Sequence, residues 1–205
     1  DFASAHRVYT ELRQGCPVAR SQRWGGFWAL TRHADVSAVL TDKRFTTSVQ
    51  NVVPKFAFTG RRPPLHLDPP EHTDYREVIN RFFSKPKMAR LEPLIRRDTV
   101  ALLQPLIDSG ETDIAADFAH RIPAYVFAEF FNLPRELAMT IREVTKIYVA
   151  AIMDVDDEVV KQYSMRLYDI ARSVIAQREA EPMDPDEDLT TALLAARPNG
   201  QPLPP

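Results

Sequence analysis

The residues best suited to chemistry lie in one segment of the 205-residue sequence, from Leu65 to Arg76. His72 and Arg76 are four residues apart in a predicted helix, so their side chains share one side of it. The guanidinium of arginine is a planar fork that can bind a carboxylate through two hydrogen bonds. Because the pair borders an apolar stripe, it would suit a flat, apolar ligand that carries carboxylates. By spacing alone, solvent exposure or pairing with Glu71 or Glu77 is the simpler explanation.

No other arrangement of reactive residues in the sequence indicates a particular chemistry. It contains no phosphate-binding glycine loop and no Gly-x-Ser-x-Gly segment. The five histidines lack the HExxH spacing of helical zinc sites. Cys16 is the single cysteine, which excludes an internal disulfide and a cysteine-only metal cluster. We interpret Cys16 as a small apolar residue beside a turn rather than as a nucleophile.

The composition limits the classes of partner. The formal net charge is -2 and the pI is about 6.2, whereas nucleic-acid-binding domains usually show a clear basic excess. No apolar run of about eighteen residues is present, so we expect no membrane-spanning helix. The first residues show neither the basic leader nor the apolar run of a secretory signal. Together with the single cysteine, these features predict a cytoplasmic protein that binds neither nucleic acid nor membrane.

The elements that would hold His72 and Arg76 in place are mostly helices. Hydrophobic periodicity and the positions of glycine and proline predict their bounds. We expect helices over 2–14, 33–40, 71–83, 93–108, 116–131, 135–152, 157–179 and 187–196, a hairpin over 18–31 and a brief strand over 111–114. No alternation of strands with helices is present, which argues against a dinucleotide-binding parallel sheet.

Apolar spacing also predicts which side of each helix faces the interior. In 33–40 the predicted inner residues are Val36, Val39 and Leu40, and in 71–83 they are Tyr75, Val78, Ile79, Phe82 and Phe83. In 135–152 they are Leu137, Ile141, Val144, Tyr148 and Ile152, and in 157–179 they are Val160, Tyr163, Leu167, Ile170 and Val174. Asp154 or Asp156 is the predicted cap of the helix over 157–179. Between these two helices, residues 46–70 form a long irregular stretch with several apolar side chains. Long loops of this kind are often functional, and their apolar side chains must be covered by the core or by a ligand.

The segment from His66 to Thr73, followed by Arg76, resembles the start of the third helix of bacterial cytochromes P-450. In that family the histidine and the arginine of this segment hydrogen-bond the propionates of the haem. Other stretches resemble the family in the same order along the chain, namely 25–33, 113–119, 122–123, 131–134 and 186–194. The resemblance implies a mainly α fold, the amino-terminal part of the cytochrome P-450 fold with helices A to H and a small β-hairpin. A weaker likeness over 50–54 and 61–65 is to forms fused to their own reductase.

The resemblance also implies a cofactor and a reaction. The cofactor would be haem b, with His72 and Arg76 as its propionate ligands. The reaction would insert one atom of O₂ into a small, largely apolar organic substrate, with electrons that come from NAD(P)H. The electron donor would be a ferredoxin or a fused flavin/iron-sulfur reductase, docked near four basic residues, Arg81, Lys85, Lys87 and Arg90. A merely solvated basic face remains the simpler interpretation of those four.

In the family the substrate lies under the loop that corresponds to residues 46–66. Phe56 and Phe58 are the preferred apolar contacts, followed by Val52 and Val53, and ordinary core packing is the alternative. The two helices predicted over 135–152 and 157–179 would form an access lid with a hinge at Asp154 to Asp157.

Three hallmarks of the family are missing from the sequence: the axial cysteine in its glycine-containing loop, the central helix with an acid/alcohol pair, and an ExxR segment. We therefore expect 1–205 to be a partial haem-thiolate monooxygenase domain, truncated before the central helix and the cysteine loop and inactive by itself. The chain would then contain no metal ligand. Two alternatives remain open: a non-catalytic helical ligand-binding or sensor module, and a haem protein with a histidine as axial ligand.

Overall fold

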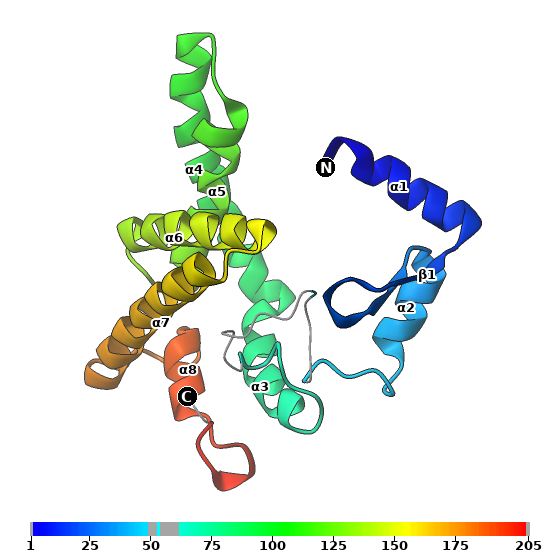
Figure 1. Cartoon of the computed structure of the whole chain (residues 1–205). Coiled ribbons are helices and arrows are strands. Elements are labelled where there is room, and N and C mark those ends of the chain that lie inside the picture. The colour runs from blue at the N-terminus through cyan, green and yellow to red at the C-terminus, as the bar shows by residue number, and fades with distance from the viewer. Residues whose placement is uncertain (1, 49–52, 54–61, 204–205) are drawn as a thin grey trace. The chain divides into compact units, whose positions relative to one another are not determined.

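The computed structural model in Figure 1 describes residues 2–48, 53 and 62–203. These residues divide into two compact units, with the boundary after His72. Val52, Phe56 and Phe58, three of the four predicted substrate contacts, lie outside the described residues. The prediction of one partial domain over 1–205 remains a prediction.

Unit 1 contains a helix, a β-hairpin and a second helix, as predicted. Its elements are α1 (Phe2–Gly15), β1 (Val18–Ser21), a 3₁₀ turn (Arg23–Gly25), β2 (Phe27–Leu30) and α2 (His33–Thr41). The strands pair antiparallel, with Val18 opposite Leu30 and Ser21 opposite Phe27. Gly25 and Gly26 have φ of 84° and 93°, a region that glycine adopts without steric cost, and they allow the tight reversal of the chain.

The predicted inner face of α2 is wrong at two of its three residues, Val36 and Leu40. Leu40 has 79% of its surface exposed, and Val36 has 37% exposed. Periodicity identifies an apolar stripe on a helix, but burial needs another element packed on that stripe. The described chain leaves most of Leu40 accessible.

Unit 2 is entirely helical among its described residues. It holds most of α3 (Glu71–Asn80), a 3₁₀ turn η2 (Arg81–Phe83), α4 (Lys85–Ser109), a π-helical turn η3 (Ile114–Ala119), α5 (Arg121–Phe130), α6 (Arg135–Asp154), α7 (Asp157–Ala180), α8 (Leu189–Ala195) and a 3₁₀ turn η4 (Pro198–Gly200). None of the helices in the described part of the chain is long and apolar enough to cross a membrane.

One predicted helix start and one predicted strand in this unit are wrong. Pro93 does not start a helix, because α4 already begins at Lys85 and continues through Pro93 and Pro105 to Ser109. A proline inside a helix removes one hydrogen bond, and the long α4 tolerates that loss. The brief strand expected over 111–114 is absent from the described residues, since the side chain of Asp113 accepts hydrogen bonds from the N–H groups of Ala115 and Ala116 and caps a helical turn.

One hydrophobic cluster of unit 2 joins the end of α3 and η2 to α8 and the end of α5. Its buried centre is Phe82, Leu189 and Ala192, and Val78, Ile79, Phe130, Phe131 and Leu193 pack around it. The apolar stripe predicted for 71–83 is thus confirmed at Val78, Ile79 and Phe82, and Tyr75 is buried as well. Phe83 was predicted inward but is 55% exposed, because the 3₁₀ turn η2 changes the helical phase after Asn80.

The two helices predicted to form the access lid pack closely on each other. α6 and α7 are joined by a short turn and lie in contact, as Figure 1 shows. Val144 and Tyr148 of α6 and Val160 of α7 are buried, which confirms their predicted inward positions. The predicted cap of α7 is also confirmed, since the side chain of Asp156 accepts a hydrogen bond from the N–H of Val159.

Candidate functional site

The first turn of α3, which carries His72, is anchored by Asp68. One carboxylate oxygen of Asp68 accepts a hydrogen bond from the N–H of Thr47 at 2.9 Å, and the other accepts one from the N–H of Ser48 at 3.0 Å. The main-chain oxygen of Asp68 accepts the N–H of His72 at 3.1 Å. Asp68 therefore ties the chain at residues 47–48 to the start of the helix.

The electrostatics of Asp68 follow from these contacts. The hydrogen bond from the side chain of Ser48, followed by that from the main chain of Thr47, lowers the pKa of Asp68 from 3.8 to about 2. A carboxylate that receives several N–H and O–H donors is favoured in its charged form. The anchor is therefore ionised at neutral pH.

His72 and Arg76 lie one helical turn apart on α3. His72 is half-buried and Arg76 is exposed. Among the described residues no acidic side chain forms an ion pair with Arg76, so the pairing with Glu77 or Glu71 considered from the sequence is not found there. The other simple explanation, that the side chain faces solvent, agrees with the observed exposure of Arg76. The role of the pair in binding propionates remains a prediction.

His66, in the same motif, has a different environment. Its Nδ1 accepts a hydrogen bond from the main-chain N–H of Arg62 at 3.2 Å. This contact leaves Nε2 as the protonated nitrogen of a neutral ring and fixes the turn before Leu67, which is 2% exposed. His66 thus holds the segment that leads to α3. The sequence analysis assigned no role to His66, because the hydrogen bond from Arg62 depends on the fold of the turn.

The predicted substrate contacts can be placed only in part. Val53, the one described residue of the four, has 45% of its surface exposed. Cys16 is also exposed, and its Sγ donates to the carbonyl of Val18 at 3.4 Å. In the described part of the chain, no group of three or more His, Cys, Asp or Glu side chains could hold a metal ion.

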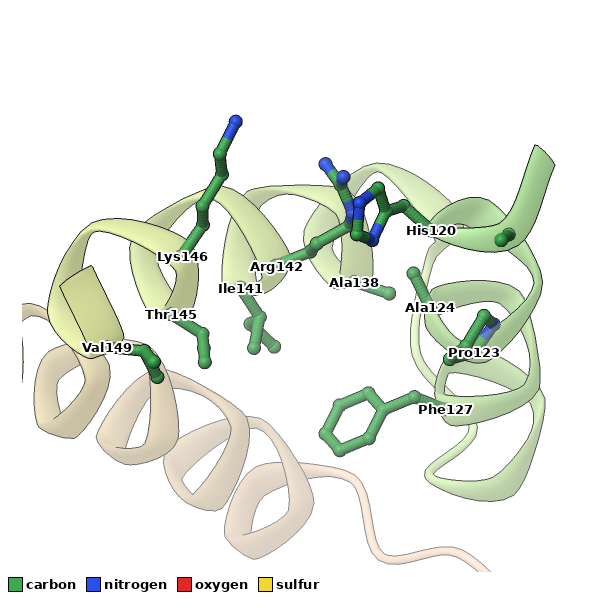
Figure 2. A pocket seen from close by; sticks show the side chains of 11 residues that line it. His120, Pro123, Ala124, Phe127, Ala138, Ile141, Arg142, Thr145, Lys146 and Val149 are labelled. Carbon is green, nitrogen blue, oxygen red and sulfur yellow. The ribbon is translucent and has the colours of Figure 1, made fainter. Parts of the chain in front are cut away.

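An apolar groove that the sequence analysis did not identify lies between α5 and α6. Its volume is about 610 Å³, which is within the usual range of ligand sites. Figure 2 shows Phe127 and Ile141 directed into the groove and Lys146 directed away from it. The small side chains of Ala124 and Ala138 also line it. Only the inward position of Ile141 was predictable from the helical spacing.

The four basic residues that were considered as a docking face are largely neutralised within the chain. Arg81 lies 3.9 Å from a carboxylate oxygen of Asp186, and Lys87 donates to the main-chain oxygen of the same residue. Glu187 lies 3.0 Å from Arg90 and 3.8 Å from Lys87. Three of the four cations therefore meet acids of the connector between α7 and α8.

Two charged clusters were missed by the sequence analysis. In the first, the buried Asp98 of α4 accepts hydrogen bonds from Arg97 at 3.0 Å and from Arg135 at 2.6 Å. In the second, the buried side chains of Arg178 and Asp188 lie 3.3 Å apart. Burial works to raise the pKa of Asp188, but hydrogen bonds from Thr191 and other donors outweigh it and lower the pKa. Both clusters join elements that are distant in sequence, and single-sequence patterns carry no signal for such pairs.

The connection between α6 and α7 contains an unusual backbone conformation. Val155 has φ of 56° and ψ of 39°, the left-handed region. A β-branched residue is rarely found there. The predicted hinge at Asp154 to Asp157 therefore coincides with a short, strained turn, although its role as a hinge remains a prediction.

Comparison with known proteins places this arrangement in a family. No protein-family model matches the chain. In sequence, the chain is 30% identical over 201 residues to cytochrome P-450 109 of Bacillus spizizenii, a match that covers 95% of the chain and 47% of the relative. It is 28% identical over 201 residues to vitamin D(3) 25-hydroxylase of Pseudonocardia autotrophica, which covers 95% of the chain and 48% of that protein.

Solved structures agree with the sequence relatives. The chain superposes on the cytochrome P-450 PksS of Bacillus subtilis 168 with a TM-score of 0.80 and 26% identity, over 97% of this chain and 50% of that one. The predicted mainly α cytochrome P-450 fold with a small hairpin is confirmed. The chain belongs to the cytochrome P-450 family, and it spans about half the length of the relatives and solved structures that it matches.

Proposed function

We propose that this chain provides the helix that binds the haem edge, and the cover of the substrate site, in a haem-dependent monooxygenase. The observation that carries the proposal is Arg76 on α3, an exposed cation that no acidic side chain among the described residues neutralises, with His72 one turn earlier. An imidazole and a guanidinium at this spacing can donate hydrogen bonds to a flat ligand with carboxylates. Haem b, the cofactor that the family implies, is such a ligand.

The residues of the chain would hold the cofactor from one edge. When bound, the haem supplies the oxygen-activating chemistry. Arg76 would hold one propionate through its planar fork, and His72 would donate a ring N–H to a propionate. The main-chain oxygen of Asp68 accepts the N–H of His72, and Tyr75 of the same helix is buried. The thiolate ligand would come from outside 1–205, so the chain by itself is expected to be inactive.

The proposed reaction inserts one atom of O₂ into a small, largely apolar organic substrate, with electrons from NAD(P)H. The apolar side chain of Val53 is 45% exposed, so it is accessible to an apolar substrate, which supports this proposal. Val52, Phe56 and Phe58 are proposed as the other contacts. A ferredoxin or a fused flavin/iron-sulfur reductase is proposed as the electron donor. Among the four basic residues considered for its docking, Lys85 is the one without an ion pair in the described part of the chain.

A second candidate is a non-catalytic module that binds a small ligand. The apolar groove between α5 and α6 supports it, because its volume of about 610 Å³ suits a small molecule. The two candidates differ in the haem spectrum. Only a haem with a thiolate ligand gives the red-shifted spectrum of the ferrous carbon monoxide complex, whereas a sensor without haem gives none and a histidine-ligated haem gives a different one.

The experiment is carried out on the haem-loaded protein that contains this chain. The ferrous carbon monoxide spectrum is recorded, and the rate of haem loss to an excess of apomyoglobin is measured for the unsubstituted protein and for Arg76→Leu. Arg96→Leu is the matched control, since Arg96 is an exposed arginine of α4 whose ion pair in the described part of the chain is with Glu92 on its own helix. We expect a thiolate spectrum, faster haem loss in Arg76→Leu and an unchanged rate in Arg96→Leu. Equal rates in the two variants, or the absence of haem, would refute the proposal.

A further inference from the structure

A buried polar cluster lies at the start of α8. Asp188, which precedes the helix, is fully buried, and its carboxylate accepts a hydrogen bond from the N–H of Thr191 at 2.7 Å. The other carboxylate oxygen accepts one from the side-chain amide of Asn132 at 3.3 Å. Asp188 is thus both the cap of α8 and its link to the turn between α5 and α6.

Arg178, at the end of α7, completes this cluster. It is 5% exposed, its Nη2 donates to the main-chain oxygen of Asn132 at 2.9 Å, and its Nε lies 3.3 Å from Asp188. Among the described residues the Nε of Arg178 has no hydrogen-bond partner, and the nearby negative charge of Asp188 compensates its positive charge. Asn132 adopts φ of 50°, a left-handed conformation that asparagine tolerates. The ends of α5 and α7 and the start of α8 therefore converge on one carboxylate.

The apolar side of α8 connects this cluster to α3. Leu189 and Ala192 follow Asp188 in the chain and pack with Phe82, and Val78 and Ile79 of α3 pack against the same centre. Val78 and Ile79 lie on the same helix as Arg76, within one turn of it. A displacement of α8 would therefore be transmitted to the helix that carries Arg76.

The physical cost of disturbing Asp188 is large. When one partner of a buried ion pair is removed, the other charge stays buried without compensation, which is far more costly than the loss of an exposed pair. Binding sites are also sensitive to small displacements. When the element that carries a binding residue moves by about 1 Å, the contacts of that residue with its ligand weaken strongly. The cluster is therefore a support for α3 within one turn of Arg76.

We infer that Asp188 is a positioning residue for Arg76: with Arg178 and Asn132 it seats α8 against α3 and so fixes the guanidinium where the cofactor binds. The inference rests on the proposed function, since it assumes that Arg76 holds a haem propionate. It assigns to the start of α8 a role in cofactor retention, although Asp188 itself does not touch the cofactor.

The first test uses Asp188→Asn in the haem-loaded protein. Asparagine keeps the size and the capping ability of aspartate and removes its charge. Asp113→Asn is the matched control, because Asp113 is also a helix-capping aspartate but lies exposed at the start of η3. We expect haem loss to apomyoglobin to be about fivefold faster in Asp188→Asn, within the range of couplings in one polar network. Asp113→Asn should leave the rate unchanged.

The second test separates positioning from general weakening. In an Arg76→Leu background the guanidinium is absent, so Asp188→Asn should add little to the rate of haem loss. If instead Asp188→Asn accelerates haem loss by the same factor with and without Arg76, the effect is not exerted through Arg76 and the inference is wrong. If Arg76→Leu alone has no effect on haem loss, the proposed function fails first, and the two failures are thus distinguishable.

The third test needs no cofactor. Hydrogen exchange of the haem-free chain should show faster exchange at the amides of 76–80 in Asp188→Asn, while the amides at the centre of α6 stay unchanged. The same pattern should be absent from Asp113→Asn. Uniformly faster exchange in both helices would indicate global destabilisation, and unchanged exchange in α3 would show that the cluster does not support that helix. Either result would overturn the inference.

Discussion

The main-chain N–H of Thr47 donates to the carboxylate of Asp68 at 2.9 Å, across 21 positions of sequence. Because the pKa of Asp68 is lowered in the folded chain to about 2 from 3.8, its contribution to stability is fully present above the unfolded pKa. The contribution is lost as the pH falls through the folded pKa, so the relevant window lies between 3.8 and about 2.

We therefore predict that the carboxyl carbon of Asp68 titrates in an NMR experiment with a midpoint near 2. The variant Asp68→Asn should be less stable than the unsubstituted chain at neutral pH, and the difference should vanish in the acid part of the window. A midpoint at the ordinary value for aspartate would mean that Thr47 and Ser48 do not hold the carboxylate in solution.

Phe82 and Phe83 are adjacent in sequence but differ in burial, at 3% and 55% exposed. Truncation of a buried phenylalanine to alanine removes apolar contacts and leaves a cavity, at a cost of about 3–5 kcal/mol. Phe82→Ala should lower the free energy of unfolding by about that amount, and Phe83→Ala should lower it by about 1 kcal/mol or less. Urea denaturation followed by circular dichroism measures both. Similar losses in the two variants would contradict the assignment of Phe82 to the core.

Val155 occupies the left-handed region with φ of 56° while 46% of its surface stays exposed. This conformation costs a residue with a Cβ roughly 1–2 kcal/mol, whereas glycine adopts it freely but loses more chain entropy on folding. Val155→Gly should therefore stabilise the chain slightly, by about 0.5–1 kcal/mol. Val159→Gly is the control, since Val159 has helical geometry in α7 and should be destabilised by the same change. Destabilisation of both variants in thermal denaturation would show that Val155 is not strained.

Asp98 is the shared acceptor of Arg97 and Arg135 and is 5% exposed. Burial works to raise its pKa, but the two arginines outweigh burial and lower it. Asp98→Asn removes the charge that both guanidinium groups face, and we expect a loss of about 1–3 kcal/mol in the free energy of unfolding. The exposed pair of Asp169 with Arg172 provides the comparison, because Asp169→Asn should change stability by less than about 0.5 kcal/mol. Both variants are measured by chemical denaturation. If they change the free energy of unfolding by the same amount, Asp98 is not part of a stabilising buried network.

Much of the helical framework was predictable because local patterns determine it. The stripe of Val78, Ile79 and Phe82 and the cap at Asp156 are signals within a few residues, and both are confirmed. Pro93 misled the prediction, because proline is favoured at a helix start and costly in a helix interior, yet the long α4 tolerates it at an interior position. The strand predicted over 111–114 is absent from the described residues, because the capping side chain of Asp113 provides a competing hydrogen-bonding arrangement.

For the candidate site, the sequence predicted the relative positions of residues on one helix but not the contacts between helices. His72 and Arg76 share a helix, so their spacing alone places them one turn apart. The contacts of Asp188 with Arg178 and Asn132 depend on the packing of distant helices, for which a single sequence contains no pattern. The neutralisation of Arg90 by Glu187 is of the same kind, since it crosses 97 positions.

Cys16 has a practical consequence. It is the single cysteine of the sequence, and its exposed thiol lies at the end of α1 in unit 1. A maleimide fluorophore would therefore attach at one defined place without any engineering. Because every helix from α4 to α8 belongs to the other unit, such a dye combined with a second label there would report the distance between the two units directly, as energy transfer in single molecules.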